Sequence, residues 1–292
     1  VVDKTEIKEI ATQSAFLDMV RQIEENNSFA VLSENLSINI SVGDIEYVLY
    51  KSGDVFNKNI EKLKELFAGD KQKICFDTKS LMHELDYFDI QINNYFDVSL
   101  AIYIANEMDA EISIYDALKL NNITTQAKAH ALIKLKEIYV NILIKNLQLK
   151  LYSDIELPLV DVLYNMERDG VKINVDEIKS LSAIYHKELD ELTDKIYNLA
   201  GEEFNINSPK QLQTILFDKL KIDFKGKKGT SIEVLKAIAD KHAIVNEIIR
   251  YRKISKLIST YLDGMLTYVS NDGKIHTTFM QRTTSTGRLS SR

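Results

Sequence analysis

Sulfur and proline are scarce in this 292-residue sequence, which holds one cysteine and two prolines. A single cysteine excludes an internal disulfide framework and is typical of proteins of the reducing cytoplasm. Cys75 lies between Ile74 and Phe76, which favours a buried structural thiol over a nucleophile. Long apolar runs are also lacking: stretches such as Ile142–Ile144 are far shorter than the ~20 residues that cross a bilayer. No basic region followed by an apolar one opens the sequence. We therefore expect a cytoplasmic location and no membrane partner.

Patterns for metal or nucleotide binding are lacking too. The histidines show no ligand spacing with one another or with Cys75. The acidic residues of the first half are scattered, whereas a metal-dependent nuclease needs several carboxylates at one point. The stretch GKKGTS, residues 226–231, is no nucleotide-binding P-loop, because Thr230 and not a lysine follows Gly229. The spacing thus predicts no metal site and no nucleotide loop.

Charge is present but unevenly spread. Residues 1–157 hold 25 acidic and 16 basic side chains, a net charge of −9, whereas residues 158–292 hold 18 and 21, a net charge of +3. An acidic half repels a polyanion and a basic half can bind one. The length favours about two domains. We place their boundary near residue 154, close to Pro158, giving domains 1–153 and 154–292.

The first domain reads as mixed α/β. Apolar spacing predicts helices around residues 16–23 and 60–67, and strands at 29–32, 36–40, 47–49 and 73–76. Such alternation indicates a partly parallel sheet. From Asp116 to Tyr152 the pattern is helical with no breaker. In the second domain, two long amphipathic stripes run from Ile178 to Leu199 and from Ile248 to Tyr268, and we expect them to pack as an antiparallel helix pair.

The segment between these two helices, residues 205–229, holds six lysines and two aspartates. In NSPKQL, Ser208 is a good N-cap and Gln211 completes a capping box; in GTSIEVL, Thr230 and Glu233 have the same spacing. Two helix starts beside Lys225, Lys227 and Lys228 form a set that could hold phosphates without reading base sequence. The alternative is a pair of well-capped surface helices beside solvated charges. Arg252 and Lys256 share one helix face, either toward the same groove or as ordinary surface charges.

The blocks NSPKQLQTILFDKL, YRKISKLISTYL and KIHTTFMQRTTSTGRLSS resemble the large fragment of bacterial DNA polymerases of family A, the DNA polymerase I type. The similarity begins at LPLVDVLYNMERDGVKIN and covers residues 155–292. It implies a helical thumb over about 175–268, which grips the minor-groove side of a primer–template duplex, and the first β-strands of a palm over about 269–292. The DNA-contacting positions that it implies, together with the tip lysines, are Asn207, Ser208, Lys210, Lys225, Lys227, Lys228, Thr230, Ser231, Arg252, Lys256, Gln281, Thr286 and Arg288.

The resemblance also implies what this sequence does not contain. In the family, the palm and fingers that follow hold two magnesium-binding aspartates, a nucleotide-binding lysine and a tyrosine at the insertion site. We expect the parent protein to be a Mg²⁺-dependent nucleotidyltransferase of DNA replication and repair at the bacterial nucleoid. Its dNTP would bind only in the full-length protein. This chain alone is expected to hold duplex DNA without polymerising, because phosphoryl transfer needs the metal ligands.

The first domain resembles, more weakly, the family's 3′–5′ exonuclease domain, which has a ribonuclease H-like α/β fold. Leu32 stands where a metal-binding aspartate belongs, Glu34 is retained, and Leu81 stands at a second aspartate position. The family's last metal-binding motif, a tyrosine followed four residues later by an aspartate, is missing near AKAHALIK. We therefore expect an inactive exonuclease fold, although shifting the alignment by a few residues would place Asp77 or Asp97 at a metal-binding position. Two alternatives stay open: an active metal-dependent exonuclease, and an interaction module without a nucleic-acid role.

Overall fold

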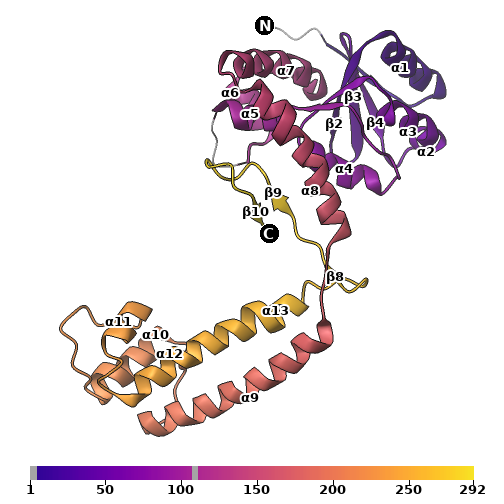
Figure 1. Cartoon of the computed structure of the whole chain (residues 1–292). Helices are drawn as coiled ribbons and strands as arrows, with labels where there is room; N and C mark the ends of the chain where they lie inside the picture. The colour runs from indigo at the N-terminus through magenta and orange to yellow at the C-terminus, as the bar shows by residue number, and fades with distance from the viewer. Residues whose placement is uncertain (1–4, 107–110) are drawn as a thin grey trace. The chain divides into compact units, whose positions relative to one another are not determined.

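The computed structural model describes residues 5–106 and 111–292. They form two compact units, the first made of Val1–Asp169 with Thr277–Arg292 and the second of Gly170–His276 (Figure 1). Within the described ranges, no helix combines the length and the apolar character that a membrane span requires. The two units are described one after the other.

The first unit is built on a six-stranded sheet with strand order β1-β4-β3-β2-β5-β6. The strands are β1 (Glu6–Glu9), β2 (Ser28–Ser33), β3 (Ser37–Val42), β4 (Ile45–Tyr50), β5 (Gln72–Cys75) and β6 (Tyr95–Asp97). The neighbours β2, β3 and β4 pair antiparallel, whereas β1 pairs with β4, β5 with β2 and β6 with β5 in parallel. The partly parallel α/β sheet predicted from sequence is confirmed, and β1 and β6 are strands that the sequence pattern did not indicate.

Helices cover both faces of this sheet, because successive side chains of a strand point to opposite faces. On β4, the Tyr47 hydroxyl donates to Asp18 of α1 (2.9 Å), whereas the adjacent Glu46 accepts from the His130 amide of α7 (2.9 Å). Figure 1 accordingly shows α7 and α1 on opposite sides of the sheet. The helices of this unit are α1 (Gln13–Glu25), α2 (Asp54–Lys58), α3 (Ile60–Ala68), α4 (Thr78–Asp86), α5 (Val98–Asn106), α6 (Ile114–Leu120), α7 (Lys128–Lys145) and α8 (Leu157–Asp169).

The long helix expected over Asp116–Tyr152 is interrupted. Asn122 adopts φ 52°, the left-handed region that ends helices, and a non-helical stretch separates α6 from α7. The predicted domain boundary near residue 154 lies within a continuous helical run, in which the π-helical turn η1 (Leu151–Glu156) leads into α8. Pro158 follows this π-helical turn as the second residue of α8, so the helical run continues through a residue that has no N–H to donate. The compact units instead divide at Asp169 and at His276, so they do not coincide with the division by family resemblance.

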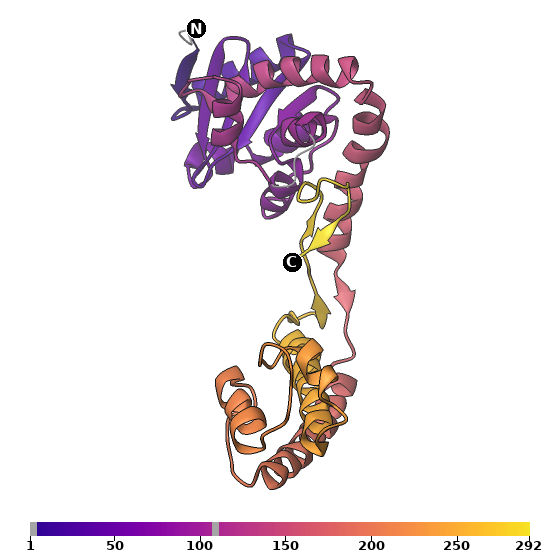
Figure 2. The ribbon, with the colours of Figure 1, turned by 90° about the vertical axis from the view of Figure 1, so that its left-hand side faces the viewer.

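The second unit is a pair of long antiparallel helices with a smaller helical tip, as predicted. Helix α9 (Val175–Ala200) lies beside α12 (Ala243–Lys256) and its continuation η3 (Leu257–Leu262) and α13 (Asp263–Leu266) in both ribbon views (Figure 2). Lys195 pairs with Glu247 (2.6 Å), and His186 pairs with Asp263 (2.8 Å), so residue numbers run in opposite directions along the pair. The tip holds α10 (Pro209–Gln213), the π-helical η2 (Thr214–Lys219) and α11 (Ile232–Ala237).

The last residues of the chain return to the first unit as a short hairpin. Strand β9 (Phe279–Met280) pairs antiparallel with β10 (Ser290–Ser291), and Thr278 and Arg292 exchange two backbone hydrogen bonds of 3.0 Å. In the second unit, β7 (Val171–Lys172) pairs antiparallel with β8 (Lys274–Ile275). The strand-like character expected after residue 269 is therefore confirmed, but in pieces of two residues each.

Candidate nucleic-acid interface

The first predicted helix start of the tip is capped as expected, but its box closes differently. The Ser208 hydroxyl accepts from the Gln211 amide, and Pro209 occupies the first turn of α10. The Gln211 side chain does not return to the Ser208 amide; its Oε1 accepts from the Asn205 amide (2.8 Å). The reason is local, because the Ser208 amide is already used in a turn to the Asn205 carbonyl (2.9 Å).

At the second predicted helix start, the N-cap lies one residue later in the sequence than predicted. Ser231, not Thr230, is the N-cap of α11 and accepts from the Val234 amide. A hydrogen bond from Ser231 lowers the pKa of the Glu233 carboxyl, which keeps a negative charge at this helix start. Thr230 instead presents its carbonyl to the guanidinium of Arg252. Both Thr230 and Ser231 stay predicted phosphate contacts, and the structure gives the capping role to Ser231.

Several predicted contact residues are brought together around the start of the tip. Asn207 donates from its side chain to the hydroxyl of Tyr251 on α12 (3.2 Å), next to Arg252. Burial lowers the pKa of Arg252, but from a value high enough that the guanidinium stays charged. Lys256, one helical turn on, is exposed. The geometry thus links the beginning of the tip to one face of α12.

The tip lysines remain solvated. Lys225, Lys227 and Lys228 are exposed, as is Lys210 on α10. The Lys228 ammonium lies 5.5 Å from the centre of the Phe217 ring, a cation–π distance, so its stem packs on the tip core while its charge stays accessible. Three solvated ammonium groups within four residues make this loop a strongly positive part of the second unit.

The three predicted contact residues of the first unit differ in exposure. Thr286 and Arg288 are exposed in the turn between β9 and β10, where Gly287 adopts φ 70°. Gln281 is buried, and its side-chain amide donates to the carbonyl (2.8 Å) and to a carboxylate oxygen (2.6 Å) of Glu156. In this structure the Gln281 side chain therefore holds the segment against Glu156 and does not face solvent, and its contact with DNA stays a prediction.

The positions expected to be degenerate in an exonuclease-like site are core positions. Leu32 on β2 and Leu81 on α4 are both buried in the core of the first unit. Glu34 is ion-paired with Lys128 on α7 (2.6 Å). The Lys128 ammonium donates hydrogen bonds to Glu34 and to the Tyr115 oxygen, and these bonds, that to Glu34 first, raise the pKa of Lys128. A leucine cannot ligate a metal and a carboxylate held by lysine is already neutralised, so this donor set does not fit a pair of divalent cations.

Asp77 and Asp97 lie at the carboxyl ends of β5 and β6. Asp97 is buried and accepts from the amides of Thr78 (2.6 Å) and Leu100 (3.0 Å) and from the Ser99 hydroxyl (2.6 Å). Asp77 is ion-paired with Arg282 (2.8 Å). Outside residues 1–4 and 107–110, no group of three or more His, Cys, Asp or Glu side chains has the geometry to hold a metal ion.

Comparisons with known proteins place this chain. Residues 175–292 match the model of DNA polymerase family A. The DNA polymerase I of Caldicellulosiruptor bescii is 35% identical over 304 residues, which covers 97% of this chain and 35% of that protein. The DNA polymerase I of Bacillus subtilis is 38% identical over 264 residues, covering 79% of this chain and 30% of that protein. The chain belongs to DNA polymerase family A.

The fold of this family A chain is also that of a solved polymerase. The POL domain of Pol1 from M. smegmatis, in complex with DNA primer-template and dNTP, superposes with a TM-score of 0.84 at 24% sequence identity. The match covers 98% of this chain and 54% of that one. The chain spans about a third of the length of these two curated relatives. The relationship does not favour an active exonuclease or a module without a nucleic-acid role.

Sequence reasoning missed the side chains that hold the C-terminal segment of this family A chain. These are Lys79, Tyr103, Glu111, Glu156, Glu167 and Arg282. The available signal was Arg282 itself, a charged residue inside the strand-like run KIHTTFMQR. Its partners lie 171 to 205 residues earlier in sequence, and no local pattern joins such distant positions.

Proposed function

We propose that this chain is the duplex-holding part of a template-dependent DNA polymerase. In this proposal residues 1–153 form a degenerate 3′–5′ exonuclease-like domain, residues 175–268 a thumb, and residues 269–292 the start of a palm. The family relationship supports a DNA partner. The observation that carries the proposal is the solvated lysine loop next to Arg252 and Asn207.

The mode of binding follows from the chemistry of these side chains. Ammonium groups and helix-start amides bind phosphates and do not contact base edges, so the interaction is independent of the DNA sequence. Each neutralised phosphate releases counterions, which makes affinity fall steeply with salt. Arg288, exposed in the β9–β10 turn, would reach the minor groove near the primer terminus. Catalysis would reside in the full-length protein, where Mg²⁺ ligands and a dNTP site are present.

The first domain is proposed to be catalytically silent. Leu32 and Leu81 are core residues and Glu34 is neutralised by Lys128, so two metals lack their ligands. A single-stranded or duplex 3′ end incubated with Mg²⁺ or Mn²⁺ is therefore expected to stay intact on a sequencing gel. Shortened 3′ ends that depend on Asp77 or Asp97 would overturn this part of the proposal.

The proposed duplex grip is tested by titrating a fluorescent primer–template duplex from 50 to 300 mM salt. Replacing Lys225, Lys227 and Lys228 by Ala should weaken binding by roughly 10- to 100-fold near 100 mM salt and reduce the salt slope by about 2 to 3. The matched control replaces the exposed Lys58, Lys119 and Lys145 of the first unit, with the same change of net charge. Equal losses in both triple variants, or binding that does not depend on salt, would sink the proposal.

A further inference from the structure

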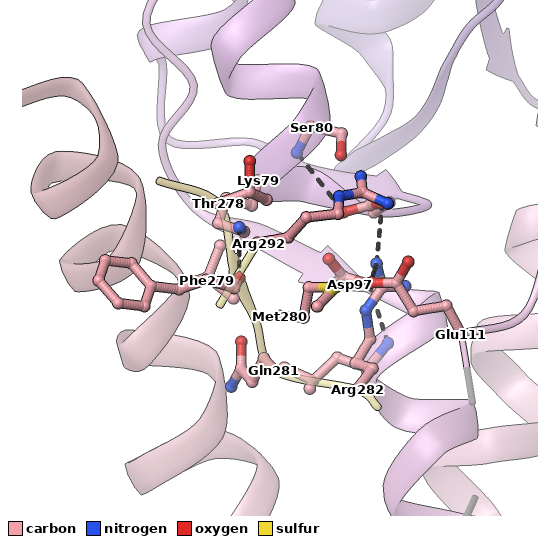
Figure 3. Close-up of a pocket in the computed structure, with 13 residues that line it drawn as sticks. Lys79, Ser80, Asp97, Glu111, Thr278, Phe279, Met280, Gln281, Arg282 and Arg292 are labelled. Atoms are coloured by element: carbon pink, nitrogen blue, oxygen red, sulfur yellow. Dashed lines mark hydrogen bonds and ion pairs between the residues drawn. The ribbon is translucent and has the colours of Figure 1, made fainter. Parts of the chain in front are cut away.

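The carboxyl edge of β5 and β6 is occupied by an arginine from the far end of the chain. Arg282 reaches this edge with its side chain only 10% exposed. Figure 3 shows Arg282 and Glu111 among the residues that line this site. One guanidinium nitrogen lies 2.8 Å from Asp77 and 3.7 Å from Glu111, and another donates to the Ser99 hydroxyl. Ser99 in turn donates to Asp97 (2.6 Å), so the positive charge is linked to all three carboxylates.

The residues around Arg282 hold the same segment at further points. Glu167, itself buried, accepts from the Phe279 amide (2.6 Å), and Lys79 donates to the Phe279 carbonyl (2.7 Å). Tyr103 donates to the Thr284 carbonyl (2.6 Å). These contacts are short and directional, but each involves a single group. Of the charged residues in 277–292, Arg282 is the one whose side chain is nearly closed off from solvent, whereas Arg288 and Arg292 are exposed.

We propose that Asp77 and Glu111 form an internal receptor for Arg282, and that this contact locks residues 277–292 onto the α/β unit. The carboxylates left at the edge of a nuclease-like sheet thereby act as a structural anchor. Arg282 is a positioning residue: it presents the β9–β10 turn, which carries Thr286 and Arg288. The locking itself is independent of DNA, whereas its effect on duplex binding rests on the function proposed above.

The charge balance explains why this arrangement depends on both partners. A buried guanidinium is stable only when carboxylates and hydrogen-bond acceptors compensate for lost water. Its planar fork can engage Asp77 and Ser99 at once, which a lysine ammonium cannot reproduce. Asp77, Arg282 and Arg292 line one cavity of about 110 Å³, but the Arg292 side chain is exposed and has no ion pair in the described part of the chain. Replacing the Arg292 side chain should therefore change the stability of this segment little.

The lock is tested without DNA by amide hydrogen exchange on the whole chain. Arg282→Met should accelerate exchange of the amides of residues 279–284 by tenfold or more, while the amides of β2 and β3 keep their rates. Arg282→Lys should restore part of the protection, and Arg292→Met, with the same change of charge, should leave it unchanged. Unchanged exchange at residues 279–284 in Arg282→Met would overturn the proposal.

A second variant separates the pairing from a general packing defect. Asp77→Asn should accelerate the exchange of the same amides. In the double variant Asp77→Asn, Arg282→Met these amides should exchange no faster than in Arg282→Met alone, because the two groups act as a pair. Additive effects of the two changes would show that Asp77 is not the receptor.

The positioning role is read from duplex binding by the same variants. Arg282→Met should weaken binding about three- to tenfold, with a salt slope no lower than that of Arg288→Met, since Arg282 itself touches no phosphate and acts through the turn. A slope lower than that of Arg288→Met would instead make Arg282 a direct DNA contact and overturn the positioning role. Faster amide exchange with an unchanged affinity for the duplex would also overturn the positioning role, and it would still support the lock. If the wild-type chain bound no duplex, the proposed function would fail while the exchange data still decided the lock.

Discussion

At the scale of single residues, Lys73 shows how burial changes chemistry. It is completely buried in β5, and its ammonium donates to the Gly69 carbonyl (2.6 Å) and is ion-paired with no carboxylate of residues 5–106 and 111–292. Loss of hydration disfavours the charged form, so burial lowers the pKa of Lys73 to about 8. The amine is therefore partly neutral at mildly alkaline pH, whereas in the unfolded chain it stays protonated to near pH 10.

This lowered pKa gives the stability of the first unit a specific pH dependence. Between pH 8 and about 10.5 the unfolded state binds more protons at this site than the folded state, so Lys73 destabilises the fold less as pH rises. We expect the stability of the wild-type protein relative to Lys73→Met to increase by about 2–3 kcal/mol over this range. Urea denaturation of both proteins from pH 7 to 10.5, followed by circular dichroism, measures the difference.

The exposed Lys58→Met variant is the control, and its stability difference from wild type should not vary with pH. A difference that is also constant for Lys73→Met would contradict the assignment of a lowered pKa to this lysine.

At the scale of elements, the pair of α9 and α12 is held by an apolar seam and by ion pairs at its rim. Ile196 and Ile248 are completely buried in the seam. At the rim, Arg250 pairs with Glu188, but the arginine side chain is 61% exposed. Exposed ion pairs contribute little because water competes for both charges. The seam should therefore dominate the stability of the helix pair.

This difference predicts unequal effects of two alanine substitutions. Ile196→Ala should lower the free energy of unfolding of the second unit by about 2–5 kcal/mol, whereas Arg250→Ala should lower it by less than about 1 kcal/mol. Hydrogen exchange of the amides of residues 243–256 reports both changes. Comparable losses in the two variants would mean that the rim pairs, and not the seam, hold these helices together.

At the scale of the whole molecule, each compact unit has its own hydrophobic core. The first core is built on the sheet and its helices, and the second on α9, α12 and the tip. Separate cores allow separate cooperative transitions, so the chain should not unfold in a single two-state step.

Core substitutions are expected to act on one transition each. Phe29→Ala should destabilise the first unit by about 3–5 kcal/mol, and Leu212→Ala the second unit by about 2–5 kcal/mol. Hydrogen exchange across a urea series would follow amides of β2 and of α9 in the same sample. If either substitution shifted both sets of amides equally, the two units would unfold as one and the prediction would be wrong.

Local patterns were a good guide to elements and a poor guide to exact partners. The period of the apolar residues located α1, α3, α9 and α12, because one face of each helix must be buried. The capping boxes were assigned to the correct helix starts. The N-cap of α11, however, is Ser231 and not Thr230, and the Gln211 side chain accepts from the Asn205 amide and not from the Ser208 amide. Several donors and acceptors lie within reach at a helix start, and the path of the chain decides which of them meet.

The sequence by itself determined the α/β first half, the antiparallel helix pair, the basic tip and membership of family A. These properties follow from residue periodicity, charge and long ordered blocks, all of which are local in sequence. Only the tertiary structure decided that Gln281 is buried, that Lys128 neutralises Glu34, and that Arg282 reaches Asp77. Each of these contacts joins residues that are distant in sequence, and a buried charge chooses its partner only after the sheet and helices have brought that partner within a few ångströms.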